Sequence, residues 1–388
     1  MKRFLLAAGI LASALLSAGN LSGTPSREIR FRGSLDNSME AMAVRKQATV
    51  AFLGGSITEM TGWRDMVQDS LRRRFPQTDF KFIDAGIASL GSTPHAFRFK
   101  EDVLSKGVPD LLFVEAAVND HTNGFGPEDQ VLAMEGIVRH ALSVNPQMDI
   151  IFLHFIYDPF IPLLDSGEIP DVILNHERVA NHYHLTSIDL ASEVAARMRS
   201  GEFDWQKFGG THPAPFGHGI YAGAVAEVLD MATKPDGEYV TGPHAVPENR
   251  LEGGCYERGR QIPPSSAVKL KGFRLVEDWM PTDGAGTRKQ YVHVPTLVCE
   301  KGGSLELEFD GTAVGVYCTC GPDAGVLSYS IDGRDYPVLD TYTRWSRGLY
   351  IPWVHMLAKD LGPGRHVLKL KVLRGERSGC CIKSFVAN

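Results

Sequence analysis

Short apolar runs alternate with stretches of helical spacing through the first part of the chain. The runs end in glycine or polar residues, and they cover about 49–53, 80–83, 111–114, 150–153 and 186–190. Between the first two, apolar residues recur at positions 63, 66, 67, 71 and 75, which is the period of an amphipathic helix. Further helical patterns span about 129–143, 173–183 and 221–231. Strands that alternate with helices predict βαβ units and a parallel sheet, so we expect an α/β domain over residues 45–233.

The pattern changes after residue 262. Residues 234–262 are rich in glycine, proline and charge, which is typical of a linker. Beyond them, strand-like segments follow one another without a long amphipathic helix, at 268–276, 305–309, 313–318, 326–331 and 366–372. Asp332-Gly333 is a hairpin-turn signal between two of these segments. We therefore expect an antiparallel β-sandwich over residues 263–388.

The N-terminus has the layout of a secretory signal peptide. Lys2 and Arg3 precede an apolar run over 4–16, and small residues follow at 17–19. The run is short for a membrane span, so we expect a cleaved signal over 1–22 and no integral membrane segment. An uncleaved N-terminal anchor is the alternative. The pattern predicts a secreted or periplasmic protein.

Charge and cysteine content narrow the class of protein further. Forty lysines and arginines stand against 46 aspartates and glutamates, and no basic stripe is present, which argues against nucleic-acid binding. All six cysteines lie after residue 250. In an oxidising compartment such clustering favours at least one disulfide in this region, although the sequence cannot choose the pairing. Zinc binding is disfavoured because no C-x-x-C pair occurs.

Polar residues suited to catalysis stand where the predicted strands end. Gly54-Gly55-Ser56 directly follows the first strand, so Ser56 is expected at the carboxyl edge of the sheet, where α/β proteins bind ligands. The segment is not the G-x-S-x-G elbow of α/β-hydrolases, because position 58 is threonine. Taken alone, Ser56 could equally be a helix cap. Three further segments change this: 84–92 after the second strand, Ala117-Val-Asn-Asp120 after the third, and Thr211-His-Pro213 before the last helix.

In this order the four segments resemble the blocks of the SGNH (GDSL-type) esterase and lipase superfamily, over roughly residues 45–233. The resemblance implies a three-layer α/β/α, flavodoxin-like fold. The sequence shows no metal site, no phosphate-cradling glycine-rich loop and no nicotinamide fingerprint, so we expect no cofactor and no metal. The resemblance also implies that Ser56 is the nucleophile, that His212 is its general base and that Asn119 donates to the oxyanion. The second block is ambiguous: Gly91 is the nearest glycine, whereas strict spacing falls on Ser89, and either would contribute a backbone N–H.

Three positions depart from the family pattern. The family usually has Asp before the serine, Gly at the start of the third block, and Asp three residues before the histidine; here these are Gly55, Ala117 and Gly209. The last is the most serious, because a triad needs a group that orients the imidazole. The nearest acid is Asp204, eight residues upstream of His212. A Ser-His dyad supported by a backbone carbonyl is favoured over a triad with Asp204, and a catalytically inactive member of the family is the third possibility.

Other histidines and aromatics carry weaker signals. His218 and His154 are interpreted as structural, whereas His95 and His121 follow the second and third blocks closely enough to touch a substrate. In the second domain, tyrosines and tryptophans gather over 342–353, and such rings either pack in a core or stack on sugars.

These observations together predict an exported, serine-dependent ester hydrolase that removes O-acetyl groups from a glycan. The expected partner is an acylated glycan or a small ester. A lipase or thioesterase of the same superfamily is the alternative enzyme, and a glycan-binding protein with an inactive site is the alternative that is not an enzyme.

Overall fold

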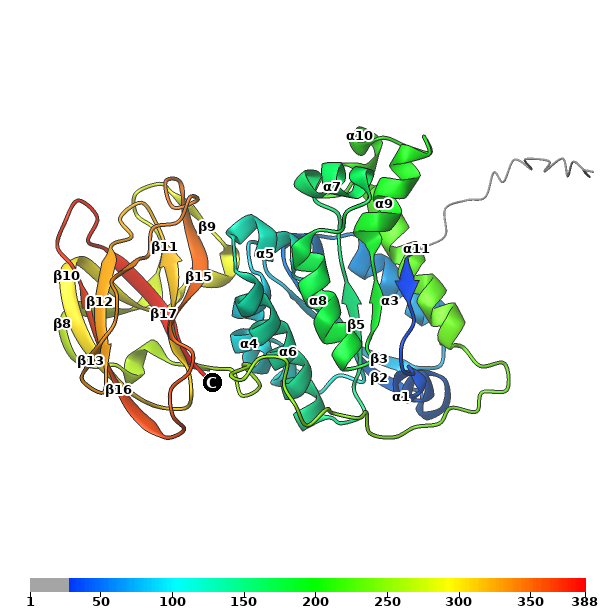
Figure 1. The fold of residues 1–388 in the computed structure, drawn as a ribbon, viewed down its shortest axis with the longest axis horizontal. Coiled ribbons are helices and arrows are strands. Elements are labelled where there is room, and N and C mark those ends of the chain that lie inside the picture. Colours follow the sequence, from blue (N-terminus) through cyan, green and yellow to red (C-terminus); the bar gives the residue numbers. More distant parts are fainter. Residues whose placement is uncertain (1–27) are drawn as a thin grey trace, which may run out of the picture.

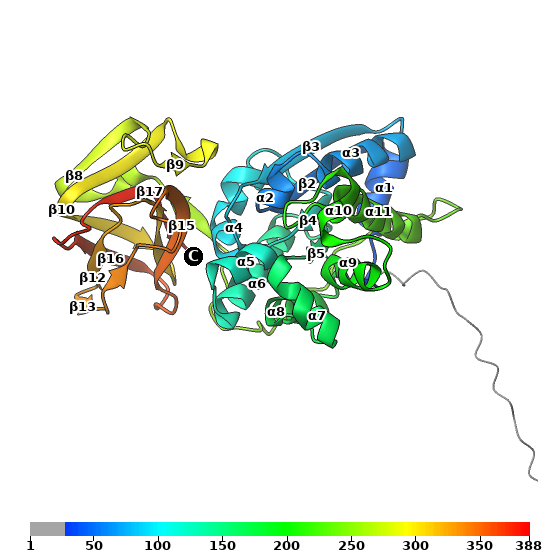
Figure 2. The same cartoon turned by 90° about the horizontal axis from the view of Figure 1, so that it is seen from above.

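The computed structural model describes residues 28–388, and the segment predicted as a signal peptide lies outside them. Two domains lie side by side: an α/β domain drawn in blue to green, and an all-β domain drawn in yellow to red (Figure 1). Helices α4 (Ser92–Phe99), α5 (Ala117–Asn123) and α6 (Pro127–Val144) are the part of the α/β domain nearest to the β domain in both views (Figures 1 and 2). Within residues 28–388, no helix combines the length and the apolar character that a membrane crossing needs.

A six-stranded sheet forms the centre of the α/β domain, in the order β1-β6-β5-β4-β2-β3. The neighbouring strands from β2 to β6 pair in parallel, and β1 adds an antiparallel edge. Apart from that edge, the order is that of flavodoxin-like sheets, as expected. The strands are β1 (Ile29–Arg30), β2 (Gln47–Gly54), β3 (Asp79–Gly86), β4 (Leu111–Val114), β5 (Asp149–Leu153) and β6 (Thr186–Ile188).

Helices cover both faces of this sheet and make a three-layer domain. Phe113 belongs to the core under α3, α9 and α11, and Leu112 belongs to the core under α4, α6 and α8. Successive side chains of a strand point to opposite faces of the sheet. Because helices cover both faces here, nearly every residue of a central strand is buried and apolar. The helices are α1 (Asp36–Glu40), α2 (Ser56–Glu59), α3 (Trp63–Arg74), α4 (Ser92–Phe99), α5 (Ala117–Asn123), α6 (Pro127–Val144), α7 (Ile161–Ser166), α8 (Asp171–His182), α9 (Leu190–Arg199), α10 (Trp205–Phe208) and α11 (Pro215–Ala232).

The second domain is a β-sandwich built around its own apolar core. Its main strand order is β13-β12-β16-β10-β17-β11-β15-β9, and every pairing is antiparallel except that of β9 with β15. The strands are β7 (Arg260–Ile262), β8 (Val268–Trp279), β9 (Gly286–Thr287), β10 (Val294–Asp310), β11 (Val314–Cys320), β12 (Val326–Ile331), β13 (Arg334–Asp335), β14 (Leu339–Asp340), β15 (Leu349–Ala358), β16 (Arg365–Val372) and β17 (Cys380–Ala387).

The segment between the domains, expected as a linker, packs against the α/β domain. Tyr256 is fully buried and its ring lies 4.7 Å from that of Phe97 on α4. Glu257 pairs with Arg139 of α6 at 2.8 Å. Tyr291 and Tyr317 of the β domain extend the same buried cluster. Because one apolar cluster includes side chains of both domains, separating them would expose apolar surface to water.

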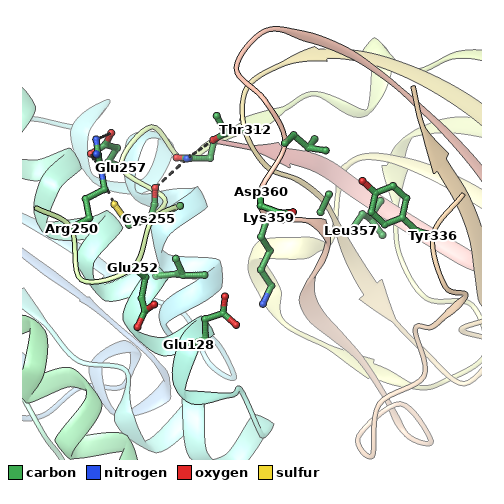
Figure 3. Close-up of a pocket in the computed structure, with 16 residues that line it drawn as sticks. Glu128, Arg250, Glu252, Cys255, Glu257, Thr312, Tyr336, Leu357, Lys359 and Asp360 are labelled. Atoms are coloured by element: carbon green, nitrogen blue, oxygen red, sulfur yellow. Dashed lines mark hydrogen bonds and ion pairs between the residues drawn. The ribbon is translucent and has the colours of Figure 1, made fainter. Parts of the chain in front are cut away.

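A cavity remains at the junction, with a volume of about 770 Å³. Glu128 and Glu252 line it from the α/β side, and Lys359 faces them from the β domain (Figure 3). Lys359 also forms an ion pair with Asp129, the residue next to Glu128, so this contact ties the two domains together.

The structure contains no disulfide among the six cysteines: all six are free thiols, and all are buried. Five of them lie on the strands of the β domain, at Cys299, Cys318, Cys320, Cys380 and Cys381. A buried free cysteine behaves as a small apolar side chain, and burial raises the pKa of the Cys299 thiol to about 11. Packing therefore accounts for these cysteines, and the prediction made from compartment and clustering was wrong.

Candidate active site

The candidate nucleophile stands where β2 ends at the carboxyl edge of the sheet. Gly54 closes the strand, Gly55 follows, and Ser56 is the first residue of α2. The chain passes very close to Asn119 here, since a Cβ on Gly55 would lie 2.0 Å from the Asn119 side-chain oxygen. Only glycine fits at that distance, which explains in this chain why the aspartate usual in the family is missing before the serine.

Ser56 and His212 are brought together from positions 156 residues apart in the sequence. The Nε2 atom of His212 lies 2.8 Å from the Ser56 hydroxyl oxygen. The histidine belongs to the short loop between α10 and α11, which Gly209 and Gly210 enter with φ of +107° and +83°. A hydroxyl and an imidazole at this distance have the arrangement in which the base removes the proton of the nucleophile.

The carboxylate that would complete a triad is not at His212. Asp204 instead caps α10, where its carboxylate accepts a hydrogen bond from the Lys207 N–H at 2.7 Å. It lines a separate depression that contains neither Ser56 nor His212. Within residues 28–388, no hydrogen bond joins Nδ1 of His212 to an acceptor, so the backbone carbonyl that was expected to orient the imidazole is not found either.

Position 209, where the family has its aspartate, has no room for a side chain. A Cβ on Gly209 would lie 1.9 Å from the backbone nitrogen of Ala214, and φ is positive as well. The missing acid therefore follows from the way the loop closes back on itself. The structure brings together a serine and a histidine, and it leaves Asp204 outside the pair.

Candidate oxyanion donors surround Ser56. Asn119 on α5 and Ser89 in the loop after β3 both line the cavity that contains Ser56. Gly91 does not line it; this residue precedes α4, and a Cβ there would lie 2.2 Å from a carboxylate oxygen of Asp120. In the part of the chain that the structure describes, neither the Ser89 N–H nor the Asn119 side-chain amide donates a hydrogen bond to another residue. Such donors can serve an oxyanion.

Both domains line the cavity, which has a volume of about 420 Å³. Arg288, Trp345, Leu349 and Ile351 form the wall contributed by the β domain. The α/β domain contributes Ser56, Ala88, Ser89, Val118, Asn119, Thr122, Asn123, Tyr157, Thr211 and His212. Trp345 is 40% exposed beside the guanidinium of Arg344, which lies 4.6 Å from its ring. Sequence reasoning did not identify Arg288, which reaches this site from the second domain.

The sequence also gave no sign of Glu115, which is buried beneath the nucleophile loop. Its carboxylate accepts hydrogen bonds from the Gly55 N–H at 2.5 Å and from the Thr58 hydroxyl at 3.1 Å. The pKa of Glu115 is raised to about 7, chiefly because the carboxyl group is buried and to a smaller extent because Asp120 is near; the hydrogen bonds from Gly55 and Thr58 oppose the increase. The sequence shows only that an acid directly follows an apolar strand. Its role could not be inferred without knowing its hydrogen-bond partners, which only the structure shows.

This carboxyl group predicts a specific pH dependence of stability. An unfolded glutamate loses its proton near pH 4.5, whereas the folded protein holds the Glu115 proton until about pH 7. Its contribution to stability is therefore complete below pH 4.5 and falls as the pH rises to 7, by roughly 3 kcal/mol. Glu115→Gln should abolish this component, which urea unfolding at pH 5 and pH 8 measures. Glu248→Gln on the exposed surface is the control, and equal pH responses of wild type and Glu115→Gln would contradict the prediction.

The remaining histidines near the sheet have structural partners. His154 is buried and bonded to Glu177 at 2.8 Å, and the Nδ1 atom of His218 accepts a hydrogen bond from the Trp63 N–H at 3.1 Å. His95 is fully buried, and its ring contacts Arg98 rather than the cavity. The ring of His121 packs 5.1 Å from that of Phe160 and does not line the cavity either. Among residues 28–388, no three His, Cys, Asp or Glu side chains are grouped to hold a metal ion.

Comparisons with known proteins agree with this architecture. Residues 52–220 match the model of the GDSL-like Lipase/Acylhydrolase family, which confirms the resemblance inferred from the four blocks. Two crystal structures of a two-domain esterase (CEX) active on acetylated mannans, one co-crystallised with mannopentaose, share the fold over both domains. Their TM-scores are 0.73 and 0.72, with 22% identity over 93% of this chain and 97% and 96% of theirs. No curated protein sequence matches the chain.

Proposed function

We propose that this chain, whose residues 52–220 match the model of the GDSL-like Lipase/Acylhydrolase family, is an esterase that removes acetyl groups from a glycan. The observation that carries the proposal is the hydrogen-bonded pair of Ser56 and His212, 2.8 Å apart, in a cavity that both domains line. Acyl transfer needs a hydroxyl nucleophile hydrogen-bonded to a base, together with N–H donors that are free to bind the oxyanion, and this site contains both.

The mechanism begins when His212 Nε2 takes the proton of Ser56 and the serine oxygen attacks the acetyl carbon. The carbonyl oxygen becomes an oxyanion, and the N–H groups of Ser56 and Ser89 together with the Asn119 amide stabilise it. The sugar hydroxyl leaves with the proton that His212 returns. Water then attacks the acetyl-enzyme, His212 again serving as base, and acetate and free Ser56 are released.

In this mechanism Ser56 and His212 act as a dyad, in which His212 is the base. Among the residues that the structure describes, no carboxylate pairs with His212, so its orientation would depend on the glycine-rich loop that carries it and on its hydrogen bond to Ser56. In a Ser-His-Asp triad the acid holds the imidazole tautomer and stabilises the imidazolium. A dyad does without that stabilisation and relies more heavily on the oxyanion donors.

A glycan is the favoured substrate because of the wall that the β domain adds. Trp345 offers an indole ring at the cavity, and aromatic faces pack well on the apolar faces of sugars. Leu349 and Ile351 continue this apolar surface. The two-domain esterase that shares the fold acts on acetylated mannans, which makes an acetylated mannan the first substrate to test.

The test is release of acetate from acetylated manno-oligosaccharides by wild type and Trp345→Ala. We expect wild type to release acetate, and Trp345→Ala to lose roughly tenfold or more in kcat/KM on the oligosaccharide while it keeps its rate on 4-nitrophenyl acetate. Met280→Ala, which removes an exposed apolar side chain of the β domain outside the cavity, is the control.

Two results would contradict the proposal. A preference for nitrophenyl esters of long acyl chains over acetate would indicate the lipase or thioesterase alternative. Binding of the oligosaccharide without hydrolysis of any ester would indicate a glycan-binding protein with an inactive site.

Export is proposed as well, on the N-terminal charged, apolar and small-residue pattern that lies outside residues 28–388.

A further inference from the structure

Arg288 of the β domain contacts the loop that carries a candidate oxyanion donor. It follows β9, which pairs with β15 through Thr287 and Tyr350, so the backbone that presents Arg288 is anchored in the β domain. From there its Nη2 and Nε atoms donate hydrogen bonds to the Ser89 hydroxyl, at 2.6 and 3.1 Å. In the described residues, Arg288 forms no ion pair with a carboxylate, so this neutral hydroxyl is the group it holds.

Ser89 has a backbone conformation that a residue with a side chain rarely adopts. Its φ is +75°, in the left-handed region where Cβ approaches the following carbonyl. Glycine would adopt this conformation without a penalty. A serine there must be held in place by its surroundings, and strained residues of this kind gather at functional sites.

The contacts that hold this loop come from both domains. Within the α/β domain, the Asn123 side chain donates to the Ser89 carbonyl at 2.9 Å, and Glu59 accepts from the Ala88 N–H at 2.8 Å. From the β domain, Gln290 donates to the other oxygen of Glu59 at 2.7 Å. Among residues 28–388, Arg288 is the only residue that bonds the side chain of Ser89.

We propose that Arg288 is a positioning residue for catalysis, which holds Ser89 in its left-handed conformation and thereby directs the Ser89 N–H into the oxyanion hole. The inference rests on the proposed ester hydrolysis, which it extends by making the β domain part of the catalytic machinery as well as of the substrate wall. It follows that this domain contributes to turnover of an ester too small to reach the sugar-binding wall.

A double-mutant cycle tests the coupling between the two residues. Arg288→Ala is made in the wild type and in Ser89→Gly, and kcat and KM are measured on 4-nitrophenyl acetate. In the wild type, we expect kcat to fall roughly 10- to 100-fold with KM little changed, since loss of a whole oxyanion donor costs about 100- to 1,000-fold. In Ser89→Gly, glycine adopts the conformation unaided, so the same change should lower kcat by less than about threefold.

Two controls separate positioning from other roles of Arg288. Lys359→Ala breaks an interdomain ion pair at the gap of Figure 3, away from the catalytic cavity, and should leave kcat within about twofold. Arg347→Ala removes an exposed cation of the β domain that does not line the catalytic cavity, and it should also leave kcat unchanged. An equal loss from Arg288→Ala in both backgrounds, or a loss confined to KM, would overturn the proposal and indicate direct substrate binding by the guanidinium.

A structural readout does not depend on activity. In a crystal structure of Arg288→Ala, we expect Ser89 to leave the left-handed region; a φ that stays near +75° would overturn the proposal. If wild type hydrolyses no ester, the proposed function fails, and this readout still decides what Arg288 does to Ser89.

Discussion

Replacement of Ser56 by alanine is expected to leave a folded protein that hydrolyses 4-nitrophenyl acetate at least about 10⁴-fold more slowly than wild type. The hydroxyl forms the hydrogen bond to His212 and supplies the electron pair that attacks the acyl carbon. Ser56 is only partly buried at the edge of the sheet, so removal of one oxygen opens no cavity in the core. Purified wild type and variant are compared by kcat/KM and by thermal unfolding.

Ser200→Ala is the matched control, because it removes an exposed hydroxyl of the same domain, bonded to the Arg197 carbonyl. It should keep wild-type activity. Labelling with a fluorophosphonate should add mass to the peptide that contains Ser56 and to no other serine peptide. Activity of Ser56→Ala within roughly tenfold of wild type, well short of the loss expected for a nucleophile, would remove Ser56 from the mechanism.

The second large effect is expected at His212, with a small one at Asp204. His212→Ala removes the base at 2.8 Å from the serine oxygen, and a loss of about 10⁴-fold or more in kcat/KM should result. Asp204→Asn should change kcat/KM by less than roughly tenfold, because asparagine caps a helix as well as aspartate does and the carboxylate does not reach His212. Both variants are measured on one activated acetyl ester.

Asp204→Ala shows what the cap contributes to stability. Loss of the hydrogen bond to the Lys207 N–H should cost about 1 kcal/mol of unfolding free energy, with little effect on turnover. If Asp204→Asn instead lost nearly as much activity as His212→Ala, the carboxylate would have to reach the imidazole during the reaction. A triad with a displaced acid would then replace the dyad.

The order of the four blocks was enough to predict the α/β/α fold and to select Ser56, Asn119 and His212. Each block directly follows a buried strand or precedes a helix, and the carboxyl ends of parallel strands meet at one edge of a sheet. Residues at those ends must therefore lie close together, whatever the loops between them do. The strand segments of the β domain were recognisable for a similar reason, because half-buried strands alternate apolar and polar residues.

Other features depended on how particular loops close. Spacing could not choose between Ser89 and Gly91, since the choice depends on which residue faces the cavity. Nearness in sequence made Asp204 a candidate, yet its carboxylate is satisfied by capping α10. The cysteines suggested a disulfide, but all six thiols are free, and four of them are part of the core of the β domain.

The sequence by itself determined the layered sheet, the β-sandwich and the presence of a serine, an asparagine and a histidine at one edge, because periodicity and strand ends are local properties of a chain. Only the tertiary structure decided what surrounds them. Glu115 lies beneath Gly55 because two strand ends pack together, and Arg288 reaches Ser89 because a second domain docks on the first. Contacts between residues 60 or 199 positions apart have no counterpart in local spacing, since they depend on packing that forms only when both partners are folded.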